Sequence, residues 1–213
     1  MREIAMETWT RREHFRVFSG FDQPYYGMCA NCEVSAFYTR VQERGYSFTA
    51  SVMYVISRAA NAIPEFRQRI RGGRVIEHEV VHPSATLLTG NDLFSFCHVR
   101  YNDDFSVFAA RAAESMAHVR AHPGLTDEPG TDDLLFMSPI PWVSFTSFDH
   151  PIPAHPPDSV PRFAWGKRFE EGGALKMPVS VHGHHALLDG LHMGRFYEKL
   201  QGLLSDPVST LGG

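Results

Sequence analysis

The clearest helical pattern in the sequence runs from residue 48 to residue 63. Its apolar residues recur at steps of three and four, which places them on one face of a helix. They are Phe48, Val52, Val55, Ile56, Ala59, Ala60 and Ile63. Pro64 follows directly and ends the pattern, because the residue before a proline disfavours the helical conformation. A helix with one apolar face has to cover another layer, so this segment predicts a sheet and belongs to the core rather than to a cofactor site.

Segments with strand-like patterns supply that sheet. The predicted strands cover residues 28–34, 74–82, 85–89, 93–99, 134–148, 162–169 and 175–183. The apolar run at 134–148 contains two prolines, so we interpret it as a strand that bends near residues 138–141. The other predicted helices cover residues 9–15, 35–45, 105–119 and 193–204, with surface loops at 122–133 and 150–161.

Length and composition limit how these elements assemble. The chain has 213 residues, of which 43% are hydrophobic and 12% aromatic, which suits one sizeable core. Several strands and a few separate helices then predict an α/β (α+β) fold, a two-layer sandwich in which helices pack on a large mixed β-sheet. We expect residues 1–213 to form a single domain.

Charge and cysteine content narrow the classes of partner. The formal net charge is −4 and the pI is near 6.3, which gives no general attraction to nucleic acid or to anionic membranes. No segment approaches 18 uninterrupted apolar residues, and the first residues lack an apolar core of signal-peptide length, so we expect a cytoplasmic protein. Cys29 and Cys32 have the spacing of half a metal site or a redox pair, but no second such pair follows. We therefore interpret the cysteines as small buried residues in a reducing compartment and expect no bound metal.

A pair of histidines near the C-terminus is the strongest candidate for chemistry. Residues 182–190 read HGHHALLDG, so an Asp-Gly pair begins four residues after the second histidine of the pair. A histidine titrates near neutral pH and can take a proton from a weak nucleophile. Asp189 need not touch the ring and could instead brace the loop by pairing with a cation. The pattern alone is equally compatible with half of a metal site or with the polar end of a buried strand.

Several further motifs, in a fixed order along the chain, favour the catalytic interpretation. They are WTRREHF at 9–15, IPEFRQRIRGG at 63–73, VHPSAT at 81–86, FS at 94–95, NDDF at 102–105, PWVSFTSFD at 141–149 and HHALLDGLHMGRF at 184–196. Together they resemble the chloramphenicol acetyltransferases of the homotrimeric type, over nearly the whole chain. The HHxxxDG motif also occurs in peptide-synthetase condensation domains and, as a variant, in dihydrolipoamide acyltransferases. The first and sixth of these motifs, WTRREHF and PWVSFTSFD, are typical of a much smaller set of proteins.

The resemblance implies the fold of the coenzyme A-dependent acyltransferases and an enzyme that transfers acetyl from acetyl-CoA to a hydroxyl of chloramphenicol. Such a reaction confers resistance to the antibiotic. His185 would be the general base, with its neutral ring held by a bond to its own backbone carbonyl. Asp189 would pair with Arg11 as structural support, and Ser138 would stabilise the tetrahedral oxyanion.

The same resemblance assigns binding residues and an assembly. Phe18, Thr86, Phe94 and Ile152 would contact the acceptor, and Trp142 and Lys167 would line the coenzyme A tunnel. The active sites would lie at the subunit interfaces of a homotrimer, where the base comes from one chain and much of the acceptor pocket from its neighbour.

Some positions depart from the family pattern. Polar residues stand where an apolar or aromatic residue is usual, namely Asp22, His150 and Asp158, and Leu125, Ala164 and Arg168 also differ from the usual residues. A carboxylate against an uncharged acceptor is costly unless it is paired. A second hypothesis is therefore an acetyltransferase of the same fold that acts on a more polar alcohol or amine. A third, a catalytically silent trimeric binding protein, is opposed by the intact set of His185, Asp189, Arg11 and Ser138.

Overall fold

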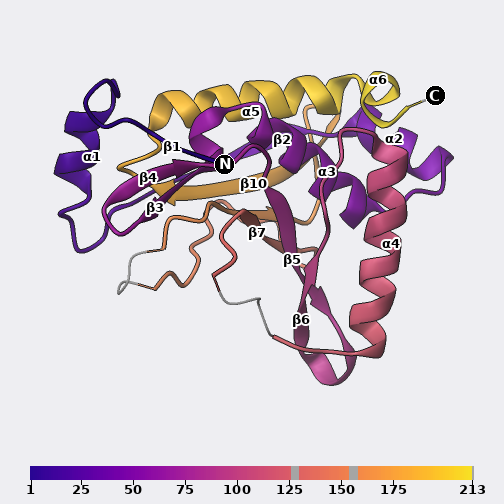
Figure 1. Ribbon diagram of the computed structural model, residues 1–213. Helices are drawn as coiled ribbons and strands as arrows, with labels where there is room; N and C mark the ends of the chain where they lie inside the picture. The colour runs from indigo at the N-terminus through magenta and orange to yellow at the C-terminus, as the bar shows by residue number, and fades with distance from the viewer. Residues whose placement is uncertain (126–129, 154–157, 213) are drawn as a thin grey trace.

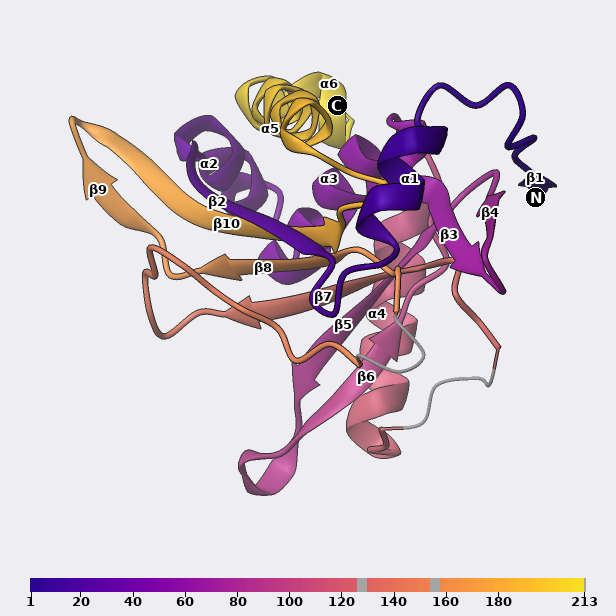
Figure 2. The same cartoon turned by 90° about the vertical axis from the view of Figure 1, so that its left-hand side faces the viewer.

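A computed structural model describes residues 1–125, 130–153 and 158–212 of the chain. Its centre is a mixed sheet whose strands follow the order β2-β10-β8-β7-β5-β6, with β9 paired to β10. Figure 2 shows these strands one below another, from β2 at the top to β6 at the bottom. The strands are β2 (Tyr25–Glu33), β5 (His82–Leu88), β6 (Phe94–His98), β7 (Leu134–Ile140), β8 (Arg162–Gly166), β9 (Phe169–Glu171) and β10 (Ala174–His184). Because β7 runs parallel to both β5 and β8 while the other pairs are antiparallel, the predicted mixed sheet is confirmed.

Helices cover one face of this sheet (Figure 1). They are α2 (Ser35–Glu43), α3 (Phe48–Asn61), α4 (Phe105–Ala121), α5 (Gly190–Ser205) and α6 (Pro207–Leu211). The short helix α1 (Arg12–Phe18) lies at one end of the sheet, near the start of α5, as Figure 2 shows. A small second sheet joins β1 (Arg2–Glu3), β4 (Arg74–Glu77) and β3 (Gln68–Arg71), and short 3₁₀ turns occupy Pro64–Arg67 and Gly90–Asp92. The two-layer architecture expected from the sequence is therefore confirmed.

A cluster of three phenylalanines joins the helical layer to the sheet. Phe66 precedes β3, Phe163 lies on β8 and Phe196 lies on α5, and all three are fully buried. Their ring centroids lie 5.3 to 5.9 Å apart, within the range of favourable aromatic pairs. The apolar face of α3 is buried as predicted, and the Ser47 side chain accepts a hydrogen bond from Ala50 N–H at its first turn.

Three predicted strands are wrong in extent, and one of them, expected at 162–169, ends at Gly166 before β9 begins at Phe169. The strand expected at 134–148 ends at Ile140, and the chain then leaves the sheet and crosses the end of β8. This crossing needs a glycine, since a Cβ at Gly166 would lie 2.7 Å from the Val143 carbonyl oxygen. The strand expected at 74–82 is two elements, because β4 ends at Glu77 and β5 begins at His82. Among the described residues, none of the helices is both long and apolar enough to span a membrane.

Truncation of Phe163 should show how much the phenylalanine cluster contributes to stability. We expect Phe163→Ala to lower the free energy of unfolding by about 3–5 kcal/mol, the usual cost of deleting a fully buried phenyl ring. Chemical denaturation followed by tryptophan fluorescence measures this change. Val208→Ala, at an exposed position of α6, is the matched control and should stay within about 0.5 kcal/mol of the parent protein. Equal effects of the two substitutions would contradict this description of the core.

Candidate active site

A tight turn at the end of β10 positions His185. The carbonyl oxygen of His184 accepts hydrogen bonds from the N–H groups of Leu187 (2.9 Å) and Leu188 (3.0 Å), so the chain reverses immediately after the strand. The His185 N–H donates to the Pro24 carbonyl oxygen (2.6 Å) and ties the turn to the neighbouring edge strand. A Cβ at Gly183 would lie 2.2 Å from the Leu188 side chain, so the glycine lets this side chain pack directly on the strand.

The turn fixes the tautomer of the His185 ring. Ring nitrogen Nδ1 lies 3.0 Å from the Leu188 carbonyl oxygen, and because a carbonyl only accepts hydrogen bonds, Nδ1 carries the proton. In the neutral ring the other nitrogen, Nε2, then keeps its lone pair and can act as a base. The ring lies between Phe18 and Tyr26, with centroids 3.8 and 4.9 Å from theirs. The expected bond from the ring to its own carbonyl is wrong, because the turn places the carbonyl of Leu188 beside Nδ1 instead.

Asp189 and Arg11 hold the turn against the N-terminal segment. Arg11 Nη1 donates to Asp189 Oδ2 at 2.6 Å, so the pairing expected from the resemblance is confirmed as a contact. Asp189 also caps α5 by accepting from the Leu191 N–H (3.0 Å). Burial raises the pKa of Asp189, but the Arg11 hydrogen bond and the nearby positive charge outweigh burial and lower the pKa to about 2. Asp189 is therefore ionised at neutral pH and supports the fold of the turn rather than the chemistry of the ring.

Two further residues of this network were missed by sequence reasoning. His192, on the first turn of α5, accepts the Asp189 N–H through Nδ1 (3.1 Å) and is almost completely buried. Its Nε2 lies 3.5 Å from Glu65. Burial raises the pKa of Glu65, but hydrogen bonds from His192 and from the Glu65 backbone, together with the nearby charges of His192 and Arg11, outweigh burial and lower it. The reciprocal cap of Asp189 and His192 was a readable signal, since the two residues have the spacing of a capping box.

A cavity of about 470 Å³ lies along β2 and β10, on the helix-free face of the sheet. Its lining includes the expected acceptor residue Ile152 and two of the unusual polar residues, Asp22 and His150. Tyr25 also lines it and pairs across the strands with His184, the residue before the base. The cavity has the size of a small-molecule site.

Other expected site residues lie far from His185 within one chain. Ser138 on β7 pairs with Ala164 on β8, which pairs with Ser180 on β10. Across the sheet, Ser138 is therefore two strands from β10, at about 4.8 Å per strand, and along β10 His185 lies five residues beyond Ser180, at about 3.3 Å per residue. Together these steps separate Ser138 from His185 by roughly 15–20 Å. Thr86 lies one strand further away on β5, and Phe94 lies on β6 with half its surface exposed. A single chain therefore does not bring Ser138, Thr86 or Phe94 to the base.

The expected coenzyme A residues do lie close together. The Lys167 N–H donates to the carbonyl oxygen of Val143, which follows Trp142, at 2.9 Å. Trp142 is 62% exposed, and Lys167 is also exposed. Arg168, by contrast, places its guanidinium 4.3 Å from the ring centroids of both Tyr38 and Phe48, so it packs on the helical layer.

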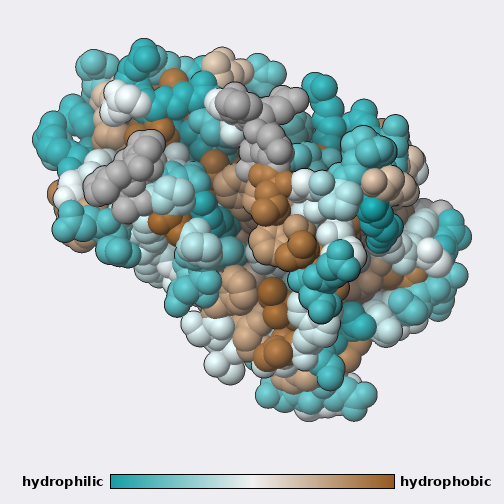
Figure 3. Space-filling view, turned by 90° about the horizontal axis from the view of Figure 1, so that it is seen from below, coloured by the Kyte–Doolittle hydropathy of each residue, from teal (hydrophilic) through white to brown (hydrophobic). Residues whose placement is uncertain are grey.

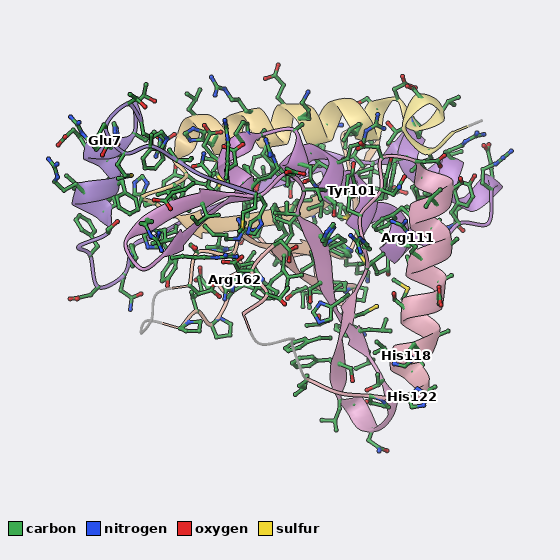
Figure 4. The ribbon with its side chains drawn as sticks, in the orientation of Figure 1. Glu7, Tyr101, Arg111, His118, His122 and Arg162 are labelled. Atoms are coloured by element: carbon green, nitrogen blue, oxygen red, sulfur yellow. The ribbon has the colours of Figure 1, made fainter. Side chains whose placement is uncertain are left out.

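The remaining unusual residues have structural partners or lie at the surface. Asp158 forms an ion pair with Arg162 (2.5 Å; Arg162 is labelled in Figure 4), so this carboxylate is neutralised within the chain. Ala164 is fully buried between Ser138 and Ser180 in the sheet, and Leu125 is exposed. The polarity that suggested a different acceptor is therefore reduced to Asp22 and His150.

The cysteines show no sign of catalytic or metal-binding chemistry. Cys29, Cys32 and Cys97 are free thiols, and burial raises the pKa of Cys32 to about 12 and that of Cys97 to about 11. Thiols with such pKa values are poor nucleophiles at neutral pH. Within the described ranges, no group of three or more histidine, cysteine, aspartate or glutamate side chains is arranged to hold a metal ion.

Comparisons with known proteins agree with this geometry. The sequence profile of the family described as chloramphenicol acetyltransferase matches residues 1–201. A chloramphenicol acetyltransferase of a Klebsiella species is 31% identical over 199 residues, which are 93% of this chain and 91% of that protein. Chloramphenicol acetyltransferase 2 of Escherichia coli is 32% identical over 207 residues, 96% of this chain and 97% of that protein. A solved chloramphenicol acetyltransferase structure aligns with a TM-score of 0.84 at 27% identity and covers 95% of this chain and all of that one.

The fold and the histidine turn define a coenzyme A-dependent acyltransferase. Within that class, the chain belongs to the chloramphenicol acetyltransferase family.

Loss of the Arg11–Asp189 pair should destabilise the turn. Arg11 is 12% and Asp189 27% exposed, so we expect Arg11→Ala or Asp189→Asn to cost about 2–3 kcal/mol, between the values for surface and buried pairs. The double variant should cost much less than the sum of the two single variants. Because the folded pKa of Asp189 lies below its ordinary 3.8, the contribution should be complete above that pH and disappear as the pH falls through about 2.

Unfolding free energies measured between pH 7 and pH 2.5 test this expectation. Arg12→Ala is the matched control, because the adjacent Arg12 forms only surface contacts. An additive double variant would show that the two residues do not act as a pair.

Proposed function

We propose that the chain is an acetyl-CoA-dependent O-acetyltransferase that acetylates a hydroxyl of chloramphenicol and thereby confers resistance, as the names of its relatives suggest. The observation that carries the chemistry is the tautomer of His185, which leaves Nε2 available as a general base. A bare alcohol is a poor nucleophile at neutral pH, and such a base typically accelerates its attack by ~10²–10⁴.

The reaction then follows from this base. Nε2 takes the proton of the acceptor hydroxyl while its oxygen forms a bond to the thioester carbonyl carbon. The tetrahedral intermediate collapses, the carbon–sulfur bond breaks, and the imidazolium returns its proton to the departing thiolate. Ser138 is proposed as the hydroxyl that donates to the oxyanion, and the turn held by Arg11 and Asp189 keeps the ring in place.

We further propose that two subunits build each active site of a homotrimer. Ser138 and Thr86 lie on the helix-free face of the sheet, whereas His185 lies near its β2 edge, so a second copy has to bring the two groups together. Figure 3 shows apolar side chains gathered across the face of the molecule seen from below, and exposed apolar residues such as Leu88, Phe94 and Val143 favour burial against another surface.

Acetyl-CoA is the proposed cosubstrate, with Trp142 and Lys167 as its contacts. A cation and an aromatic ring suit the phosphates and the adenine of coenzyme A. We propose that residues 1–213 act as one domain. Three free thiols favour a reducing compartment, so the cytoplasm is the proposed location.

Thiol release from acetyl-CoA, followed with a thiol reagent, tests the reaction. We expect release that depends on chloramphenicol, and a loss of at least ~10²-fold in kcat for His185→Ala without loss of the folded state. His122→Ala, at an exposed position, is the control and should be fully active. A folded protein that binds coenzyme A but shows no drug-dependent release would favour the more polar acceptors instead.

A mixing experiment tests the shared site. His185→Ala and Ser138→Ala should each be nearly inactive, the latter by ~10²–10³-fold. When the two variants are unfolded and refolded together, some interfaces of the mixed trimers should unite an intact His185 with an intact Ser138, and roughly a quarter of the parent activity should return. Activity that stays at the level of the separate variants would show that both residues act within one subunit.

A further inference from the structure

The cavity along β2 and β10 is lined by His182, a histidine with a defined orientation. His182 lies three residues before the base on β10, so at about 3.3 Å per residue the two residues are separated by roughly 10 Å. The His182 side chain is 12% exposed, and its Nε2 lies 3.2 Å from Asp149 Oδ1. Because a carboxylate accepts hydrogen bonds, Nε2 carries the proton and Nδ1 is left as an acceptor.

That acceptor is buried and has no hydrogen-bond partner among the described residues. The ring packs directly on Gly27 of the neighbouring strand. A Cβ at Gly27 would lie only 2.4 Å from two atoms of the ring. A buried acceptor without a partner costs free energy, so its presence in a cavity indicates a ligand atom that donates to it.

His150 adds a second polar group to the same cavity. Its ring packs edge-to-face on His182, with centroids 5.5 Å apart, and on Phe148. Both ring nitrogens are buried, and although the Phe163 backbone is close enough to affect the ring's pKa, neither nitrogen has a partner with hydrogen-bond geometry among the described residues. Desolvation lowers the pKa of His150 to about 4 and also lowers that of His182. At neutral pH both rings are therefore uncharged.

The charges around the two rings limit what the cavity can bind. Asp149 and Asp22 both line it, and both side chains are exposed. Carboxylate side chains disfavour a negatively charged group of the acceptor, and among the described lining residues there is no lysine or arginine. A neutral hydroxyl or amide N–H is not repelled by the carboxylates, needs no cation beside it, and can donate to Nδ1 of His182.

We infer that His182 and His150 form a specificity subsite for a second, neutral hydrogen-bond donor of the acceptor, in the cavity next to the end of the strand that carries the base. This inference rests on the proposed function and goes beyond it, because it assigns to this chain an acceptor class: neutral molecules that carry a hydroxyl or amide N–H in addition to the reacting hydroxyl. Chloramphenicol meets this requirement with its second hydroxyl and its amide.

Steady-state kinetics of His182 variants test the subsite. His182→Leu removes the acceptor atom, and we expect KM for chloramphenicol to rise roughly 5- to 15-fold with kcat unchanged, as for the loss of one hydrogen bond in binding. His182→Asn keeps an oxygen near the position of Nδ1 and should stay within about threefold of the parent. Gly27→Ala should raise KM as His182→Leu does, because it displaces the ring without deleting it. His118→Leu, at the far end of α4 (Figure 4), is the control and should change neither constant.

Two chloramphenicol analogues identify the donor. One lacks the second hydroxyl, and the other carries a methyl group on the amide nitrogen. For the analogue that lacks the contacted donor, the parent protein and His182→Leu should have the same KM, as in a double-mutant cycle.

The outcomes separate the two proposals. No turnover of chloramphenicol by the parent protein would overturn the proposed function and this inference with it. Turnover with an unchanged KM in His182→Leu would overturn the subsite alone. An unchanged KM with a lower melting temperature of the trimer would assign the two rings to a subunit contact, which also overturns the subsite.

Discussion

The hydrogen bond between His185 Nδ1 and the Leu188 carbonyl oxygen is the constraint on which the function depends. It exists because the chain reverses at His184, and Leu188 packs over Gly183 in that reversal. The bond places the proton on Nδ1 and so decides which nitrogen can act as the base. A neutral ring held by a backbone carbonyl needs no carboxylate partner, which explains why the aspartate of the motif supports the turn from a distance.

That support extends well beyond the motif. Asp189 connects Arg11 of the N-terminal segment to His192 of α5, and His192 connects in turn to Glu65 in front of the small sheet. Four partly or fully buried polar side chains therefore tie three distant parts of the chain to one turn. Removing water from such groups is costly, and they remain favourable only because each has a partner. The network is thus a reason for a unique arrangement of the turn more than a source of stability.

The sequence predicted the elements that obey a local pattern. The helix at α3 and the hairpin that ends in β10 follow from periodicity and from turn residues, and the mixed sheet follows from their order. The end of β7 could not be predicted, because residues 141–149 are as apolar as a strand and leave the sheet only where Gly166 lets the Val143 carbonyl approach. Likewise, the pairing of Arg11 with Asp189 joins residues 178 positions apart, so it came from a family resemblance and not from spacing.

In the acceptor cavity, too, the local sequence does not show which contacts a residue makes in the fold. Asp22, His150 and Asp158 look alike in the sequence, as polar residues in proline-rich loops, yet the structure gives them different environments. Asp158 is neutralised by Arg162, Asp22 faces solvent at the cavity rim, and His150 is buried against His182. Only the last arrangement leaves hydrogen-bonding capacity without a partner among the described residues. Specificity in such a cavity depends less on the number of polar residues than on which of them have no hydrogen-bond partner in the fold. Only those residues gain a hydrogen bond when a matching ligand binds.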